Sequence, residues 1–385
     1  MTVPSCRRWF ACLALTVLLA GCAAPTRVVP AAGTFELVHP EFLEQYAVTR
    51  RFRSGEPAAI TVTPDGRAVL FLRSEARSNE QDLYELDLRT GAERRLLTAS
   101  SLLRGAAEAL TPEERARRER MRQSARGITS FDLSDDGARV LVPLSGRLYV
   151  IDRADGRVRE LPDDPGAPID PHFSPDGRRV ACARDGELYV YDLDGGAGRR
   201  LTSDASDTVT NAVSEFVAQE EMGRLRGFWW SPDGRAIAYQ QTDVGALETM
   251  FIADAMHPDR APQSWRYPRP GHANAIVRLG VVGAEGGPTT WIDWDARRYP
   301  YLATVTWDEH GPLALLVQNR EQTEEVLLRA DPESGATTPL HVERDDAWLN
   351  LDQSVPHWLA DGSFLWTTER NGAWQIEHRG RDGTL

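Results

Sequence analysis

A short phrase built on Asp-Gly recurs along the chain and constrains the fold more than any other feature. Each copy joins a short apolar strand, a tight turn and a second β-rich strand. The copies are TVTPDGRAVLFL (61–72), FDLSDDGARVLVPL (131–144), HFSPDGRRVACAR (172–184), WWSPDGRAIAYQQ (229–241) and HWLADGSFLWTT (357–368). Because Asp-Gly supplies the positive φ that two-residue hairpin loops need, each copy predicts an antiparallel hairpin.

A second hairpin phrase follows several of these copies. It reads DLYELDLRTGAERRLLT (82–98), RLYVIDRADGRVRELP (147–162) and ELYVYDLDGGAGRRLT (187–202), and EVLLRADPESGATTPL (325–340) is similar. Two hairpins make four antiparallel strands, which is one blade of a β-propeller. The sequence therefore predicts an all-β propeller of four-stranded blades. A β-sandwich is the alternative, but a sandwich does not repeat its turn chemistry at the spacing of a blade.

Charge and cysteine content exclude several classes of partner and of site. The 385 residues carry a formal net charge of −13, which disfavours binding to nucleic acid or to an anionic membrane surface. Three of the four cysteines lie in the first 22 residues, so Cys182 alone remains in the body of the chain. Neither an intrachain disulfide nor a cysteine metal site is expected there, and Cys182 is predicted to be a small buried strand residue.

The amino terminus has the pattern of an export signal. A basic start and a short apolar run end in Leu19-Ala20-Gly21-Cys22, which resembles a bacterial lipobox. We predict a signal peptide over 1–22, lipidation of Cys22, and a periplasmic protein whose contact with a membrane is its lipid. An ordinary signal peptide cleaved near Ala23 or Ala24 is the alternative. A linker over 23–50 would then precede a propeller over 51–385.

One segment interrupts the β pattern. TPEERARRERMRQSARG (111–127) begins like a helix and then contains almost only helix-forming residues. It is polar on every side, which predicts a short inserted helix outside the core. This helix is either a solvated connector or an arm that carries arginines towards a site.

Two adjacent carboxylates, Glu220 and Glu221, precede an apolar segment in SEFVAQEEMGRLRGFWWSPDG (214–234). By spacing alone they would be solvated helix residues. The segment, however, resembles the dipeptidyl peptidase IV family of serine exopeptidases, in which a short helix with paired glutamates precedes a WWSP strand. Further stretches look like landmarks of that family in the same order: RERMR…GITSFD (118–132), SWRYPRPGHANAIVRLGVV (264–282), YLATVTWDEHGPLALLVQNREQ (301–322) and DDAWLNL…HWLADGSFLWTTERNG (345–372).

The resemblance implies roles for particular residues. Glu220 and Glu221 would bind the α-ammonium group of a peptide with a free amino terminus, because two converging carboxylates give charge-assisted hydrogen bonds that a blocked peptide cannot match. An arginine would bind a backbone carbonyl of the substrate. Position relative to GITS points to Arg122, with Arg118 one turn away as the second choice. The alternative is that these arginines pair with glutamates of their own helix.

The family also implies parts that this sequence does not contain. Family members have an eight-bladed propeller, of which about six blades are expected here, and an α/β-hydrolase domain with a Gly-x-Ser-x-Gly elbow, which we do not find. The hydrolase domain would be a partner of this chain, and the full-length family member is expected to be a homodimer. No cofactor or metal is implied. A non-catalytic periplasmic propeller lipoprotein that serves as a binding scaffold is the alternative function.

Overall fold

The computed structural model describes residues 39 and 41–385. The predicted signal peptide and lipobox, with Cys22, lie outside the described residues. The first described element is helix α1 (Glu41–Val48), which falls within the predicted linker. No helix in the described part of the chain has the length and apolar character needed to cross a membrane.

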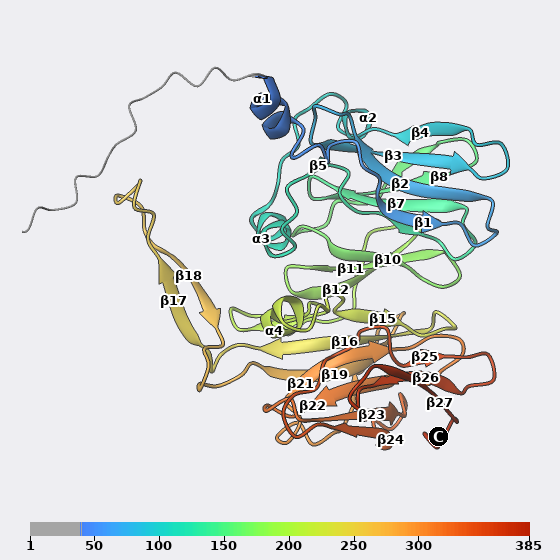
Figure 1. The fold of residues 1–385 in the computed structure, drawn as a ribbon, viewed down its shortest axis with the longest axis vertical. Helices are drawn as coiled ribbons and strands as arrows, with labels where there is room; N and C mark the ends of the chain where they lie inside the picture. Colours follow the sequence, from blue (N-terminus) through green and yellow to red (C-terminus); the bar gives the residue numbers. More distant parts are fainter. Residues whose placement is uncertain (1–38, 40) are drawn as a thin grey trace, which may run out of the picture.

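Three blades come first along the chain (Figure 1). Blade 1 contains β1 (Ala58–Val62), β2 (Ala68–Ser74), β3 (Glu80–Asp87) and β4 (Glu93–Leu97), with β5 (Arg126–Gly127) added beside β3. Blade 2 contains β6 (Asp132–Leu133), β7 (Arg139–Leu144), β8 (Arg147–Asp152) and β9 (Val158–Glu160). Blade 3 contains β10 (Ile169–Phe173), β11 (Arg179–Arg184), β12 (Glu187–Asp192) and β13 (Arg199–Arg200).

Three more blades follow. Blade 4 contains β14 (Val209–Asn211), β15 (Phe228–Trp230), β16 (Ala236–Asp243), β19 (Ile276–Gly283) and β20 (Thr290–Trp291). Blade 5 contains β21 (Tyr301–Thr306), β22 (Ala314–Gln318), β23 (Glu324–Ala330) and β24 (Thr337–Arg344). Blade 6 contains β25 (His357–Trp358), β26 (Phe364–Thr368) and β27 (Gln375–Arg379). A hairpin of β17 (Glu248–Ile252) and β18 (Gln263–Tyr267) projects from blade 4 (Figure 1). The all-β propeller prediction is confirmed, and its hairpins fall where the repeated phrases place them.

The apolar core lies between successive blades. Five clusters of buried residues each join one blade to the next, from blades 1 and 2 through to blades 5 and 6. Successive side chains of a strand point to opposite faces, so Val140 and Val142 of β7 pack towards blade 1 whereas Leu141 packs towards blade 3. Cys182 is fully buried in β11, as predicted.

The repeated turns are wider than the sequence predicts. In blade 3 the backbone of Ser174 pairs with Arg179, which leaves four residues in the loop instead of two. Gly177 alone has a positive φ, of 65°. The Ser174 hydroxyl donates to Asp176 (2.6 Å) and accepts from the backbone N–H of Arg179 (2.9 Å). The prediction of two-residue loops is therefore wrong, because the serine and aspartate side chains close a longer loop built on a β-turn.

The interrupting polar segment forms a shorter helix than its composition suggests. After α2 (Ala99–Leu102), helix α3 covers Pro112–Arg120 with Thr111 as its N-cap. No described side chain of this helix belongs to the apolar core clusters, as predicted, although Arg118 on its inner side is buried. Its burial is possible because two carboxylates neutralise its charge.

Candidate functional site

The paired glutamates lie on an excursion of the chain between β14 and β15 of blade 4. β14 and β15 both pair with β16, and residues 212–227 leave the sheet between them. Ala212 donates to the carbonyl of Gln240, and the backbone N–H of Gln240 donates to Gly227, both at 2.8 Å. A Cβ on Gly227 would lie 2.3 Å from the Ala212 carbonyl oxygen. The two ends of the excursion therefore meet at one point of the sheet, and only glycine fits there.

Helix α4 (Phe216–Glu220) forms the tip of the excursion and carries Glu220, with Glu221 at its C-cap. The Glu215 carboxylate accepts from the backbone N–H of Ala218 at 2.8 Å and from that of Val217, which caps the helix. Within the helix Ala218 is buried, whereas Glu220 and Glu221 are exposed. Neither carboxylate has a hydrogen bond or ion pair with the described residues.

The chain after the glutamates is attached to two further blades. Met222 is buried between blades 5 and 6, and its carbonyl accepts from Gln353 at 2.7 Å. The buried Arg224 guanidinium donates to the carbonyl of Leu302 in blade 5 at 3.0 Å. Burial lowers the pKa of Arg224 to about 10. The backbone segment that carries the exposed glutamates is therefore fixed by contacts with blades 4, 5 and 6.

Helix α3 contacts α4 although the two are far apart in sequence. The Arg120 guanidinium donates to the side-chain oxygen of Gln219 at 3.1 Å, and its central carbon lies 5.8 Å from the centre of the Phe216 ring. Phe216 also packs edge-on against Tyr267 of β18, with ring centres 5.0 Å apart. Both helices lie on the side of the blades from which the β17–β18 hairpin projects (Figure 1). The structure thus brings the arginine arm and the glutamate helix together.

Arg118 and Arg122 lie in contrasting surroundings. The Arg118 side chain is 6% exposed and donates to Glu108 (2.7 Å) and Glu114 (2.6 Å). The pairing within the helix that the sequence left open therefore occurs for Arg118, and both of its carboxylates help to hold α3 in place. Arg122 follows the end of the helix, has a φ of 51° and is exposed. Its side chain has no hydrogen bond or ion pair with the described residues.

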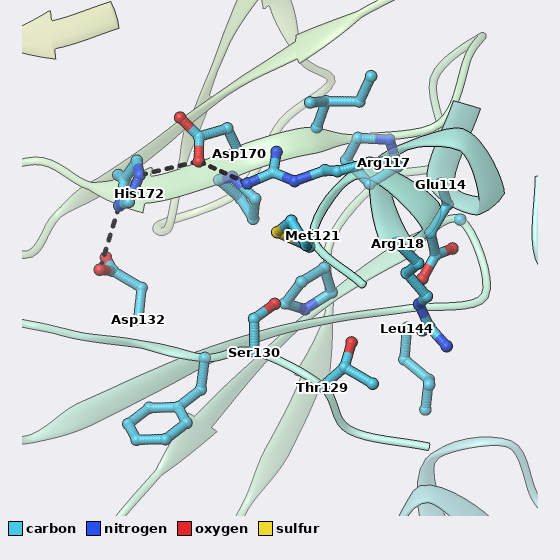
Figure 2. A pocket seen from close by; sticks show the side chains of 16 residues that line it. Glu114, Arg117, Arg118, Met121, Thr129, Ser130, Asp132, Leu144, Asp170 and His172 are labelled. Atoms are coloured by element: carbon cyan, nitrogen blue, oxygen red, sulfur yellow. Dashed lines mark hydrogen bonds and ion pairs between the residues drawn. The ribbon is translucent and has the colours of Figure 1, made fainter. Parts of the chain in front are cut away.

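A charged cluster fixes the inner side of α3 to blade 3 (Figure 2). Arg117 donates to Asp170 (3.1 Å), and Asp170 lies 3.4 Å from the Nε2 atom of His172. The Nδ1 atom of His172 is 3.2 Å from Asp132 of blade 2 and 3.0 Å from Arg226. Burial alone would raise the pKa of Asp170, but the hydrogen bond from His172 and the nearby positive charges lower it.

The same cluster raises the pKa of His172, whereas it lowers that of Asp170. Burial would lower the pKa of His172, but its hydrogen bonds to Asp132 and Asp170 raise it. Because the ring contacts Asp132 on one side and Asp170 on the other, His172 is placed as a structural bridge between two carboxylates. Beneath α3, the cluster borders a cavity of about 120 Å³ whose lining also includes Met121, Ser130 and Leu144 (Figure 2).

Sequence reasoning missed several residues of this region. The arm is connected to the propeller by Arg120, Gln219, Asp170 and His172. Two signals in the sequence pointed to this region: the many arginines of the arm, and the position of Gln219 beside the glutamates. Among the residues that the structure describes, no group of three or more His, Cys, Asp or Glu side chains could hold a metal ion.

Comparison with known proteins identifies the family. The family model described as "Dipeptidyl peptidase IV (DPP IV) N-terminal region" matches residues 134–385. The chain belongs to this family. A solved structure of Porphyromonas gingivalis dipeptidyl peptidase 4 agrees in fold, with a TM-score of 0.68 and 20% identity over 88% of this chain and 47% of that one. The family resemblance found in the sequence is confirmed.

Curated relatives match a shorter part of the chain. Inactive dipeptidyl peptidase 10 of Mus musculus is 26% identical over 190 residues, which cover 46% of this chain and 23% of that protein. Dipeptidyl peptidase 8 of Mus musculus is 27% identical over 188 residues, covering 38% and 21%. Venom dipeptidyl peptidase 4 of Apis mellifera is 26% identical over 163 residues, covering 39% and 21%. The matched segments span about a fifth of the length of these relatives.

Proposed function

We propose that this chain is the substrate-recognition propeller of an exported serine-type dipeptidyl aminopeptidase, which releases dipeptides from free amino termini. Glu220 and Glu221 bind the α-ammonium group of the peptide, and Arg122 binds a backbone carbonyl. The bond is cut by the Ser-Asp-His triad of an α/β-hydrolase domain. The proposal is supported above all by one observation: two adjacent carboxylates, both exposed, stand on a tip that three blades anchor.

The physical basis is electrostatic. Two adjacent carboxylates repel each other, and an ammonium group placed between them relieves the repulsion while it donates hydrogen bonds to both. A fixed backbone favours this interaction, because little conformational entropy is lost when the ligand binds. An acetylated amino terminus has no charge and keeps only one N–H donor, so it cannot donate to both carboxylates, and the site selects free amino termini.

The arginine role rests on the position of α3. The contact of Arg120 with Gln219 holds the end of the arm beside the glutamate helix, and Arg122 is the exposed arginine that follows. Arg118 is committed to Glu108 and Glu114. We therefore assign the substrate carbonyl to Arg122.

Localisation and assembly belong to the same proposal. Lipidation of Cys22 places the enzyme at a bacterial membrane on its periplasmic side, and the full-length enzyme is a homodimer. The scaffold function remains the competing hypothesis, and the name of one relative, inactive dipeptidyl peptidase 10, is a reason to test binding separately from catalysis.

The test is a binding measurement on this chain by saturation-transfer NMR. The probes are a dipeptide amide with a free amino terminus and the same compound acetylated on its amine. The free amine is expected to bind and the acetylated compound is not, and the Glu220→Gln, Glu221→Gln double variant is expected to lose the difference. Glu333→Gln, on an exposed turn of blade 5, is the matched control. Equal binding of both probes would favour the scaffold.

A further inference from the structure

Two glutamates face each other inside blade 5, away from the site described above. Glu325 of β23 and Glu343 of β24 are directly paired across the two strands. They are 6% and 4% exposed, respectively. Like charges in directly opposed positions of a sheet destabilise it, and burial increases that cost. The pair therefore needs cationic or hydrogen-bonding partners.

Glu343 has such partners within the protein. It accepts from Thr368 (2.9 Å), from the Trp366 indole (3.3 Å) and from the Arg370 guanidinium (2.9 Å), and it lies 2.9 Å from the His341 ring. Although burial opposes it, these partners lower the pKa of Glu343 to about 2. This carboxylate joins blade 5 to blade 6 and is fully compensated.

Glu325 is not compensated in this way. One of its oxygens accepts from Gln318 at 2.9 Å. The other has no hydrogen-bond partner among the described residues, and no described cation lies within ion-pair distance of Glu325. The side chain borders a small, open cavity of about 20 Å³ between blades 5 and 6, so the free oxygen lies next to space that is continuous with solvent.

The walls of this cavity suit an organic cation. Trp348 and Trp374 line it and are 56% and 52% exposed. Asp345 and Glu369 line it too, and neither forms an ion pair with a described residue. Asp345 instead accepts from the backbone of Ala347 and Trp348. The two arginines of the lining are engaged elsewhere, Arg370 with Glu343 and Arg344 with Glu324.

We propose that this cavity is a binding site for a guanidinium group, such as the side chain of an arginine-containing peptide. A planar guanidinium can donate to the free oxygen of Glu325 and to a second carboxylate at the cavity while its face stacks on a tryptophan. A metal ion fits less well, because hard cations prefer a closed set of oxygen ligands and the walls here are aromatic. The site is separate from Glu220 and Glu221 and does not depend on the proposed peptidase function.

The experiment is a saturation-transfer NMR titration of the full chain at pH 8 with butylguanidinium as the probe and neutral butylurea as its isostere. Butylguanidinium is expected to bind and butylurea is not. Glu325→Gln keeps the shape of the side chain and removes its charge, so it is expected to weaken binding roughly tenfold or more. Trp348→Ala is expected to weaken binding as well.

Two controls make the result decisive. The first control is Glu333→Gln, on the exposed turn between β23 and β24, and the second is the Glu220→Gln, Glu221→Gln double variant. Both are expected to bind the probe like the wild type. Absence of binding to the wild type, equal binding of butylurea, or unchanged binding in Glu325→Gln would each overturn the proposal. Loss of binding in the Glu220→Gln, Glu221→Gln double variant would also overturn the proposal, because it would show that the probe binds at Glu220 and Glu221 and not at Glu325.

Discussion

The buried Glu325 predicts an unusual dependence of stability on pH. Burial, reinforced by the charge of Glu343 and only partly offset by the hydrogen bond from Gln318, raises the pKa of Glu325 from 4.5 to about 7. At about 1.4 kcal/mol per pKa unit, the fold favours the protonated carboxyl by roughly 3 kcal/mol. Its contribution to stability is therefore fully present below pH 4.5 and is lost as the pH rises through 7.

Glu325→Gln removes the ionisation and is expected to stabilise the protein at pH 8. The gain in the free energy of unfolding should approach about 3 kcal/mol at pH 8 and shrink towards zero near pH 4.5. Urea unfolding of both proteins at a series of pH values measures it. Glu343→Gln is the opposite control, because the pKa of Glu343 is lowered to about 2 and its charge stabilises the fold above pH 4.5. A Glu325→Gln variant that gains nothing between pH 4.5 and pH 8 would refute the reasoning.

Three further predictions concern single residues. Arg118→Met leaves the Glu108 side chain, which is 6% exposed, with only the more distant Arg126 (3.8 Å) as a cation and removes the ion pair of Glu114, so it is expected to cost roughly 3–5 kcal/mol in urea unfolding, whereas the exposed Arg122→Met should stay within about 0.5 kcal/mol. Cys182 is fully buried, and burial raises the pKa of its thiol to about 12, so mass spectrometry should find it unmodified by iodoacetamide in the native protein at pH 8 and modified in urea. Cys22→Ala is expected to move the protein from the membrane fraction to the soluble periplasmic fraction, and unchanged fractionation would contradict lipidation.

The fold could be predicted because its determinants are local. The Asp-Gly phrase lies at a hairpin turn in five of the six blades, and blade 5 has a longer turn between β21 and β22 instead. The width of the loops was missed, because the bond between Ser174 and Asp176 closes a four-residue loop that the dipeptide Asp-Gly alone does not reveal. The order of the blades follows from the order of the phrases.

The surroundings of the site could be predicted only in part. Glu220 and Glu221 stand out by adjacency and by family resemblance, and both are local signals. The contact between Arg120 and Gln219 joins residues 99 positions apart, and a helix that is polar on every side has no periodicity to indicate its buried face. The burial of Arg118 and of Glu325 was missed for a related reason, since charged residues are normally exposed and only the surrounding side chains explain their burial.

The central claim is that Glu220 and Glu221 recognise the free amino terminus of a peptide. The most direct measurement is kcat/KM for a free dipeptidyl substrate and for its amino-acetylated analogue, in an enzyme that joins this propeller to the proposed α/β-hydrolase domain. Each charge-assisted hydrogen bond is worth about 1.5–3 kcal/mol, so Glu220→Gln and Glu221→Gln should each lower kcat/KM for the free substrate roughly ten- to a hundredfold. The double variant should lose most of the preference for the free amine, with its fold intact by circular dichroism. A double variant that discriminates as well as the wild type would contradict the account.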